Sequence, residues 1–148
     1  MKKYLFVCRY NIFRSPYSAS WFSKYCKDHN IDAEVNSAGI AVEPGFDSET
    51  PLTKSLVHWA DRILVMEDYM KENIFEIFDL GKKRSIDVAS LGIPDKFRPF
   101  VSDAAEIERM SAKEALEYLA KDADNPDFLF GKGLMNKILE ANLDLILR

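Results

Sequence analysis

One stretch near the N-terminus decides the fold, and it reads Tyr4-Leu5-Phe6-Val7-Cys8-Arg9-Tyr10-Asn11-Ile12-Phe13-Arg14-Ser15-Pro16. Residues 4–7 are apolar and include residue types that favour strands, so they predict a short buried strand. Ser15 and Pro16 are typical of a helix N-cap and a first helical turn. The stretch therefore predicts a strand, a tight loop and a helix in direct succession.

The predicted loop has the chemistry of an anion site. A guanidinium binds two phosphate oxygens at once, so Arg14 is expected to clamp a phosphate while the Cys8 thiol lies beneath the phosphorus. The free amides at the start of the helix face the same anion. The alternative is a structural cysteine and a surface arginine. It is disfavoured because the strand before the loop and the Ser15-Pro16 start after it both agree with a phosphate loop.

Apolar patterns beyond the loop predict alternating strands and helices. The further strands are expected at residues 33–36, 63–66 and 86–89, and the helices at residues 16–29, 51–59 and 67–78. Four strands joined by helical crossovers imply an α/β fold with a doubly wound, four-stranded parallel sheet and helices on both faces. The ligand of such a sheet lies at the carboxyl ends of its strands, where Cys8 is placed.

The C-terminal third has helical patterns only. Asp103-Ala104-Ala105-Glu106 and Ser111-Ala112-Lys113-Glu114 both fit capping boxes, and amphipathic spacing continues through residues 134–145. The last helix is expected to pack on the sheet. Residues 1–148 are therefore predicted to form a single domain.

Composition and charge disfavour several classes of protein. The 148 residues carry a net charge of −4, so no basic surface is expected for nucleic acid or for an anionic membrane. No apolar run approaches the length of a membrane span, and the apolar run before Arg9 is too short for a signal peptide. The two cysteines favour neither a disulfide framework nor a metal site. We therefore expect a cytoplasmic protein that uses no metal or other cofactor.

The loop resembles that of the low-molecular-weight protein tyrosine phosphatase family, whose motif runs Cys-x-x-Asn-x-x-Arg-Ser-Pro. The matching residues here are Cys8, Asn11, Arg14, Ser15 and Pro16. Further matches are Ser37-Ala38-Gly39, residues 59–67 and Ile93-Pro94-Asp95-Lys96-Phe97, the last similar to a shorter bacterial branch described as phosphatase-like. The resemblance implies hydrolysis of phosphomonoesters, with phosphotyrosine in proteins or small aryl phosphates as substrates, through a phosphocysteine intermediate on Cys8.

The resemblance also implies roles for individual residues. The catalytic residues are expected to be Cys8 as nucleophile, Arg14 as clamp and Asp95 as general acid. The residues expected to bind the substrate are Arg9, Tyr10, Asn11, Ile12, Phe13, Ser15 and Phe97, with Phe46 a further candidate for the wall of the cleft. Asn11 and Ser37 are expected to support the loop from behind. Core packing remains the alternative for each aromatic residue, and a turn residue with left-handed backbone remains the alternative for Asn11.

Several positions depart from the family pattern or leave alternatives open. Lys96 stands where the family has the proline after its acid, so Asp124 and Asp127 compete with Asp95 for the acid role. Tyr10 replaces a glycine, and Phe13 replaces a cysteine that can protect an oxidised nucleophile.

Other residues carry simpler expectations. Glu67 is expected only to open a helix, where a carboxylate complements the helix dipole, and Cys26 is expected to be an inert buried thiol. Two alternative functions also follow. A phosphate- or phosphotyrosine-binding module without catalysis stays open, whereas an arsenate reductase is disfavoured because no cysteine follows Cys26.

Overall fold

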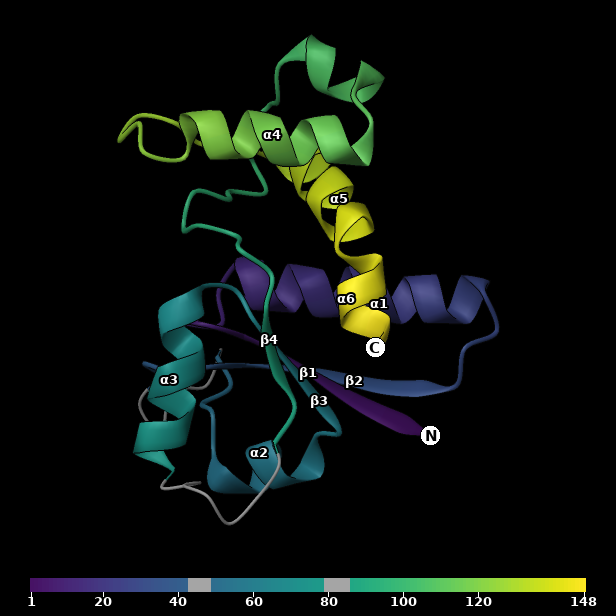
Figure 1. The fold of residues 1–148 in the computed structure, drawn as a ribbon, viewed down its shortest axis with the longest axis vertical. Coiled ribbons are helices and arrows are strands. Elements are labelled where there is room, and N and C mark those ends of the chain that lie inside the picture. Colours follow the sequence, from purple (N-terminus) through teal and green to yellow (C-terminus); the bar gives the residue numbers. More distant parts are fainter. Residues whose placement is uncertain (43–48, 79–85) are drawn as a thin grey trace. The chain divides into compact units, whose positions relative to one another are not determined.

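The computed structural model describes residues 1–42, 49–78 and 86–148. These residues form two compact units, Met1–Gly92 and Ile93–Arg148 (Figure 1). Buried apolar side chains lie in both units. The single domain expected from the sequence therefore stays a prediction. Phe46, a candidate for the wall of the cleft, lies outside the described residues.

The N-terminal unit is built on a four-stranded parallel sheet. Its elements are, in chain order, β1 (Lys2–Cys8), α1 (Arg14–Asp28), β2 (Ala33–Gly39), α2 (Lys54–Trp59), β3 (Arg62–Val65), α3 (Asp68–Ile77) and β4 (Val88–Ser90). The strand order is β2-β1-β3-β4, and every neighbouring pair is parallel. The predicted four-stranded parallel sheet is confirmed.

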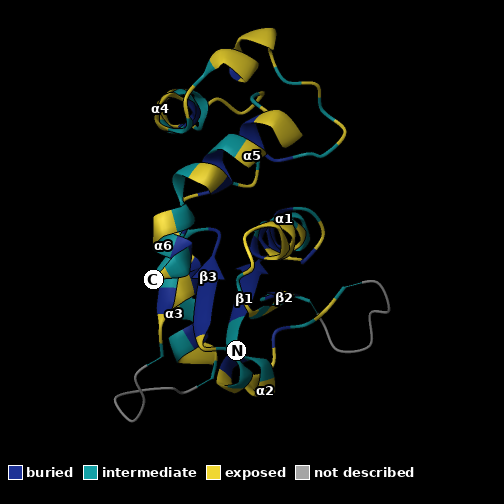
Figure 2. Cartoon of the chain, turned by 90° about the vertical axis from the view of Figure 1, so that its right-hand side faces the viewer, coloured by how far each residue is buried: buried dark blue, intermediate teal, exposed yellow. Residues whose placement is uncertain are grey.

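The strand order explains why helices cover both faces of this sheet. The chain passes from β1 to β2 in one direction and then returns past β1 to β3 and β4 in the other. Since crossovers between parallel strands are right-handed, α1 packs on one face of the sheet and α2 and α3 on the opposite face (Figure 2). The order in which the chain adds strands to the sheet changes direction between β1 and β3. Sheets of this kind bind their ligands at the carboxyl ends of the two strands at that point.

The core of this unit lies around the two central strands. Leu5, Phe6 and Val7 of β1 are fully buried, as are Ile63, Leu64 and Val65 of β3 (Figure 2). Strands covered on both faces are apolar throughout rather than alternating, which is why both segments read as continuous apolar runs. The ring of Phe22 from α1 is also fully buried. Its centroid lies 5.7 Å from that of Phe6.

The C-terminal unit is helical. Its elements are the 3₁₀ helix η2 (Ala105–Arg109) and the helices α4 (Ala112–Asp122), α5 (Lys132–Ala141) and α6 (Leu143–Leu147). The capping box predicted at the start of α4 is confirmed, because Ser111 and Glu114 each accept a hydrogen bond from the other's backbone N–H. None of the described helices is both long and apolar enough to cross a bilayer.

The capping box predicted at Asp103 is wrong. Helix η2 begins after Ala104 without a side-chain cap, and the Asp103 carboxylate caps α5 instead. It accepts hydrogen bonds from the backbone N–H groups of Gly131 at 2.8 Å and Leu134 at 3.2 Å. A side chain at position 131 would collide with the backbone of Val101, so this close approach requires glycine. Tertiary contact therefore overrode a local sequence pattern.

Candidate active site

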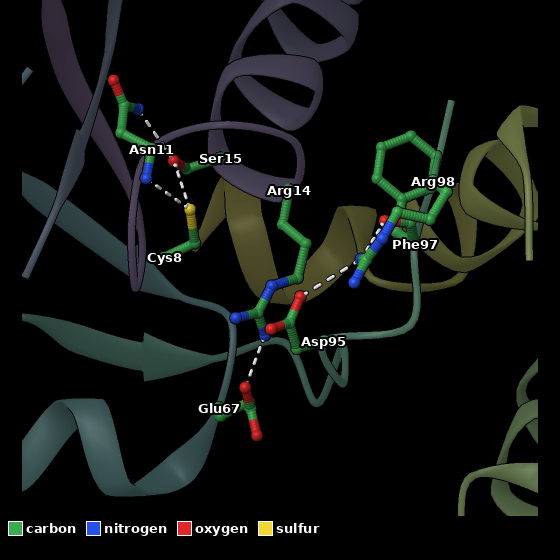
Figure 3. Close-up of polar contacts among 8 residues, drawn as sticks. All are labelled: Cys8, Asn11, Arg14, Ser15, Glu67, Asp95, Phe97 and Arg98. Atoms are coloured by element: carbon green, nitrogen blue, oxygen red, sulfur yellow. Dashed lines mark hydrogen bonds and ion pairs between the residues drawn. The ribbon is translucent and has the colours of Figure 1, made fainter. Parts of the chain in front are cut away.

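The phosphate loop connects the end of β1 at Cys8 to the start of α1 at Arg14 (Figure 3). The N-cap of α1 is Phe13, which makes no side-chain cap, so the expected N-cap at Ser15 is wrong. Ser15 lies inside the first helical turn, which contains no acidic residue. The positive end of the α1 dipole is therefore not neutralised by its own first turn, as an anion site requires.

The hydroxyl of Ser15 faces the sulfur of Cys8 instead of capping the helix. Ser15 Oγ lies 2.9 Å from Cys8 Sγ and 3.3 Å from the carbonyl oxygen of Ala38. A hydroxyl carries one proton, so Ser15 can donate to only one of these two acceptors at a time. The backbone N–H of Asn11 also donates to Cys8 Sγ, at 3.2 Å. When the Ser15 hydroxyl turns to the sulfur, two donors stabilise negative charge on it.

Asn11 holds the loop in shape through its side chain. Its amide nitrogen donates to Ser15 Oγ and to Ser37 Oγ, both at 2.9 Å, and its amide oxygen accepts from the backbone N–H of Thr50 at 3.0 Å. Asn11 also has a φ of 56°, a left-handed conformation that asparagine tolerates better than most residues. Asn11 thus supports the loop through its side chain and also occupies a turn position with left-handed backbone.

Gly39 at the end of β2 backs the loop closely. A Cβ atom at this position would lie 2.8 Å from the backbone nitrogen of Asn11 and 2.8 Å from the carbonyl carbon of Tyr10. Such distances force backbone atoms to move. Glycine is therefore required here by the loop and not by a local turn. The loop is tied to the same segment by hydrogen bonds from Ile40 N to the Cys8 carbonyl and from Ala41 N to the Arg9 carbonyl.

Arg14 has a partner that the sequence did not reveal. Its guanidinium Nη1 lies 2.5 Å from Glu67 Oε1, and the side chain of Arg14 is only 4% exposed (Figure 3). Glu67 is the N-cap residue of α3, as expected, but its side chain makes no capping hydrogen bond and pairs with Arg14. Glu67 follows β3 by two residues, and β3 is the neighbour of β1. The carboxyl ends of adjacent parallel strands lie at the same edge of a sheet. A charged residue that follows each of two neighbouring strands is therefore the sequence signal that could have predicted this contact.

The outer edge of the phosphate loop is formed by three exposed side chains, Arg9, Tyr10 and Ile12, which we call the loop rim. Tyr10 is 45% exposed and Ile12 is 51% exposed, whereas Cys8 is 3% exposed. The guanidinium carbon of Arg9 lies 5.1 Å from the centre of the Tyr10 ring, a cation–π contact. Phe13, which follows the rim in the chain, is half-buried. The thiol thus lies at the bottom of a loop whose edge is cationic and apolar.

The segment expected to supply the general acid belongs to the C-terminal unit. Asp95 has a side chain that is 55% exposed and that accepts a hydrogen bond from Arg98 Nη1 at 3.3 Å (Figure 3). Phe97 is fully buried, with its ring centroid 5.8 Å from that of Phe130. This is the core packing left open as the alternative for Phe97. The role of Phe97 beside the substrate stays a prediction, as does the acid role of Asp95.

The competing acids lie close to the same segment within this unit. Asp124 and Asp127 are exposed in the turn after α4. Lys96 Nζ donates to the carbonyl oxygen of Asn125 in that turn at 3.3 Å, which joins the turn to the residue after Asp95. All three candidate acids therefore lie in the C-terminal unit, and its geometry favours none of them over the others.

Comparison with known proteins finds a family match for the part of the chain that carries the phosphate loop. A family model described as low molecular weight phosphotyrosine protein phosphatase matches residues 3–56. The matched range contains the whole phosphate loop and ends soon after the start of α2. No curated protein matches the sequence significantly.

Solved structures of low molecular weight phosphatases share the fold over nearly the whole chain. A YwlE mutant from Bacillus subtilis is 19% identical, with 100% of each chain covered and a TM-score of 0.61. The tyrosine phosphatase Wzb from Escherichia coli K30, in complex with phosphate, is 20% identical, with 98% of each chain covered and a TM-score of 0.57. A YwlE arginine phosphatase mutant with a phosphorylated active-site serine is 18% identical, with 95% of each chain covered and a TM-score of 0.56. These likenesses show the low molecular weight phosphatase fold.

The family match covers the loop and its support and ends before the other site residues. Cys8, Arg14, Ser37 and Gly39 lie inside the matched range, and the phosphatases of this family are cysteine-dependent enzymes. Glu67 and the segment of Asp95 lie beyond it. The roles expected of Cys8 and Arg14 are therefore supported by a family match as well as by geometry, whereas the role expected of Asp95 depends on the resemblance of a short segment.

Proposed function

We propose that this chain is a phosphatase that hydrolyses phosphomonoesters through a phosphocysteine intermediate on Cys8, with phosphotyrosine in proteins and small aryl phosphates as substrates. One observation carries the proposal. The sulfur of Cys8 lies at the centre of a loop where Asn11 N, Ser15 Oγ and the start of α1 converge on it. A thiolate needs such donors to act as a nucleophile, and a transferring phosphoryl group needs the same donors for its equatorial oxygens.

The proposed reaction has two steps. In the first, the Cys8 thiolate attacks phosphorus, a P–S bond forms, and the P–O bond to the leaving group breaks. The leaving oxygen takes a proton from a carboxylic acid, which we assign to Asp95, with Asp124 and Asp127 as the alternatives. In the second, water attacks phosphorus, the carboxylate takes the proton from this water, and the P–S bond breaks. Inorganic phosphate leaves and the thiolate returns.

Arg14 and Glu67 prepare the loop for a dianion. The guanidinium of Arg14 can bind two equatorial oxygens at once, which an ammonium cannot do. In the absence of substrate, the Glu67 carboxylate balances the charge of the buried guanidinium and restricts its orientation. A clamp that is already oriented loses less entropy when the phosphate arrives.

The loop rim supports an aryl substrate. The exposed ring of Tyr10 and the exposed side chain of Ile12 offer apolar surface beside the buried thiol, and apolar walls suit a flat phosphoaryl group. One of the proteins of similar fold, YwlE, is an arginine phosphatase, so phosphoarginine is the appropriate competing substrate.

Turnover with the nucleophile removed tests the proposal. We expect wild-type protein to hydrolyse p-nitrophenyl phosphate in the presence of a chelator, and we expect Cys8→Ser to be inactive while it still binds vanadate. Arg14→Lys should lose both turnover and phosphate affinity, because a single ammonium cannot replace the clamp. Equal activity in wild type and Cys8→Ser would contradict the covalent mechanism. Vanadate binding without turnover in wild type would support the binding module instead.

A further inference from the structure

Resting on the proposed function, we propose that Arg9 selects phosphotyrosine sites that carry an acidic residue directly beside the phosphotyrosine. Arg9 follows the nucleophile in the chain, at the outer edge of the phosphate loop. Arg14 faces inward and is buried, whereas Arg9 is exposed. The loop therefore carries two guanidinium groups in different positions, and only the inner one is needed for the phosphate itself.

The position of Arg9 is fixed by its surroundings. Its carbonyl oxygen accepts a hydrogen bond from Ala41 N at 2.7 Å, and its side chain lies against the Tyr10 ring. Tyr10 stands where the resembling family has glycine, so the ring is an added surface on which the guanidinium rests. A side chain held in this way loses less rotamer entropy on binding than a free arginine does.

The charge of Arg9 is available to a ligand. Within residues 1–42, 49–78 and 86–148, no carboxylate forms an ion pair with Arg9, whereas Arg14 and Arg62 are paired with Glu67 and Asp87. The cation–π contact leaves the charge of the guanidinium intact. An exposed cation at the edge of the loop attracts an anionic group that lies beside the bound phosphate.

The geometry of a peptide substrate supplies such a group. The phosphotyrosine side chain must reach down to the buried Cys8, so its backbone stays above the loop rim. Consecutive Cα atoms of a peptide lie about 3.8 Å apart, so the residue beside the phosphotyrosine lies over the rim as well. A carboxylate there meets Arg9, whereas a lysine there is repelled by it.

Matched phosphotyrosine peptides test this proposal. We compare kcat/KM for three peptides that differ only in having Glu, Gln or Lys next to the phosphotyrosine. The control substrate is p-nitrophenyl phosphate, which has no neighbouring residues. For wild type we expect the Glu peptide to exceed the Gln peptide by about twofold to fivefold, the range of an exposed ion pair, and the Lys peptide to be poorest. The preference should shrink as salt is added, because exposed charges are screened.

The decisive quantity is the ratio of kcat/KM for the Glu and Gln peptides within each variant, whatever the variant's overall activity. Arg9→Gln should bring this ratio to one, and Arg9→Lys should keep part of it. Lys27→Gln removes the same charge from the last turn of α1, about 20 Å along the helix from the loop, and should leave the ratio unchanged. If wild type hydrolyses p-nitrophenyl phosphate but has a ratio of one, the role of Arg9 is overturned while the proposed function stands. No turnover of any substrate would overturn the proposed function.

Discussion

The ion pair between Arg14 and Glu67 predicts a variant that is less stable but binds phosphate more tightly. Glu67→Gln keeps an oxygen acceptor for the guanidinium and removes the negative charge. Removing one partner of a fully buried ion pair costs about 3–5 kcal/mol. The Glu67 side chain is 31% exposed, so water compensates part of the loss, and we expect about 2 kcal/mol. For a chain of this size that lowers Tm by about 4–8 °C.

Phosphate binding is expected to change in the opposite direction. The Glu67 carboxylate lies beside the Arg14 guanidinium, and we expect a bound phosphate on the opposite side of the guanidinium. A charge of −1 and a dianion roughly 7 Å apart repel each other by about 1 kcal/mol even in water. Because the amide oxygen of glutamine still orients Arg14, loss of this repulsion decides the sign. Glu67→Gln should therefore bind phosphate about fivefold more tightly.

Thermal denaturation with and without phosphate measures both effects in one experiment. The phosphate-dependent rise in Tm should be larger for Glu67→Gln than for wild type, because phosphate replaces the missing charge beside Arg14. Asp68→Asn removes a charge from the next residue, in the first turn of α3, and should match wild type in its phosphate response. An unchanged Tm in Glu67→Gln, or a weaker phosphate response than wild type, would refute the reasoning.

Three further predictions concern the loop, the acid and the second thiol. Gly39→Ala requires the phosphate loop to move by about 0.5 Å, the limit of tolerance for a catalytic arrangement, so kcat/KM should fall about tenfold or more while circular dichroism still shows folded protein. Asp95→Asn should slow turnover about a hundredfold for aryl phosphates with poor leaving groups and much less for those with good ones, because only poor leaving groups need the proton. If Asp95→Asn slows poor and good leaving groups equally, while Asp124→Asn or Asp127→Asn slows mainly the poor ones, the acid role moves to the turn after α4. Burial raises the pKa of the Cys26 thiol above its usual 9.0, so iodoacetamide at pH 7 should label Cys8 first, as peptide mass spectrometry can measure. A raised thiol pKa stabilises the fold below pH 9 and loses this contribution as pH rises through the folded value, so a Cys26→Ala variant should lose less stability than wild type above pH 9.

The features that follow from short segments were predictable from the sequence. The strand before Cys8, the loop and the helix after it lie within one continuous segment, and the pattern of apolar residues determined them. The four-stranded parallel sheet followed because strand-like segments alternate with helical ones, and residues 4–7 and 63–66 are continuous apolar runs typical of buried central strands. Asn11 and Ser37 were expected together only from the family resemblance, since they lie on different elements.

The features that depend on tertiary contacts were not predictable in the same way. Glu67 contacts Arg14 across 53 positions of sequence, and only the neighbouring places of β1 and β3 in the sheet bring the two side chains together. Ser15 was expected to cap α1 from its residue type, but its hydroxyl oxygen accepts from the Asn11 amide and its proton is shared between the Cys8 sulfur and the Ala38 carbonyl. Asp103 was expected to cap the helix that follows it, yet it caps α5. Polar side chains with several available partners are where local rules fail.

The central claim is that phosphate is transferred to the sulfur of Cys8. Rapid acid or denaturant quenching during turnover of an aryl phosphate, followed by peptide mass spectrometry, measures this directly. The account predicts a phosphorylated peptide whose phosphate is on Cys8, present only while substrate is being consumed and missing in Cys8→Ser. Steady turnover with phosphate on another side chain, or with no phosphorylated peptide at any quench time in wild type, would contradict it.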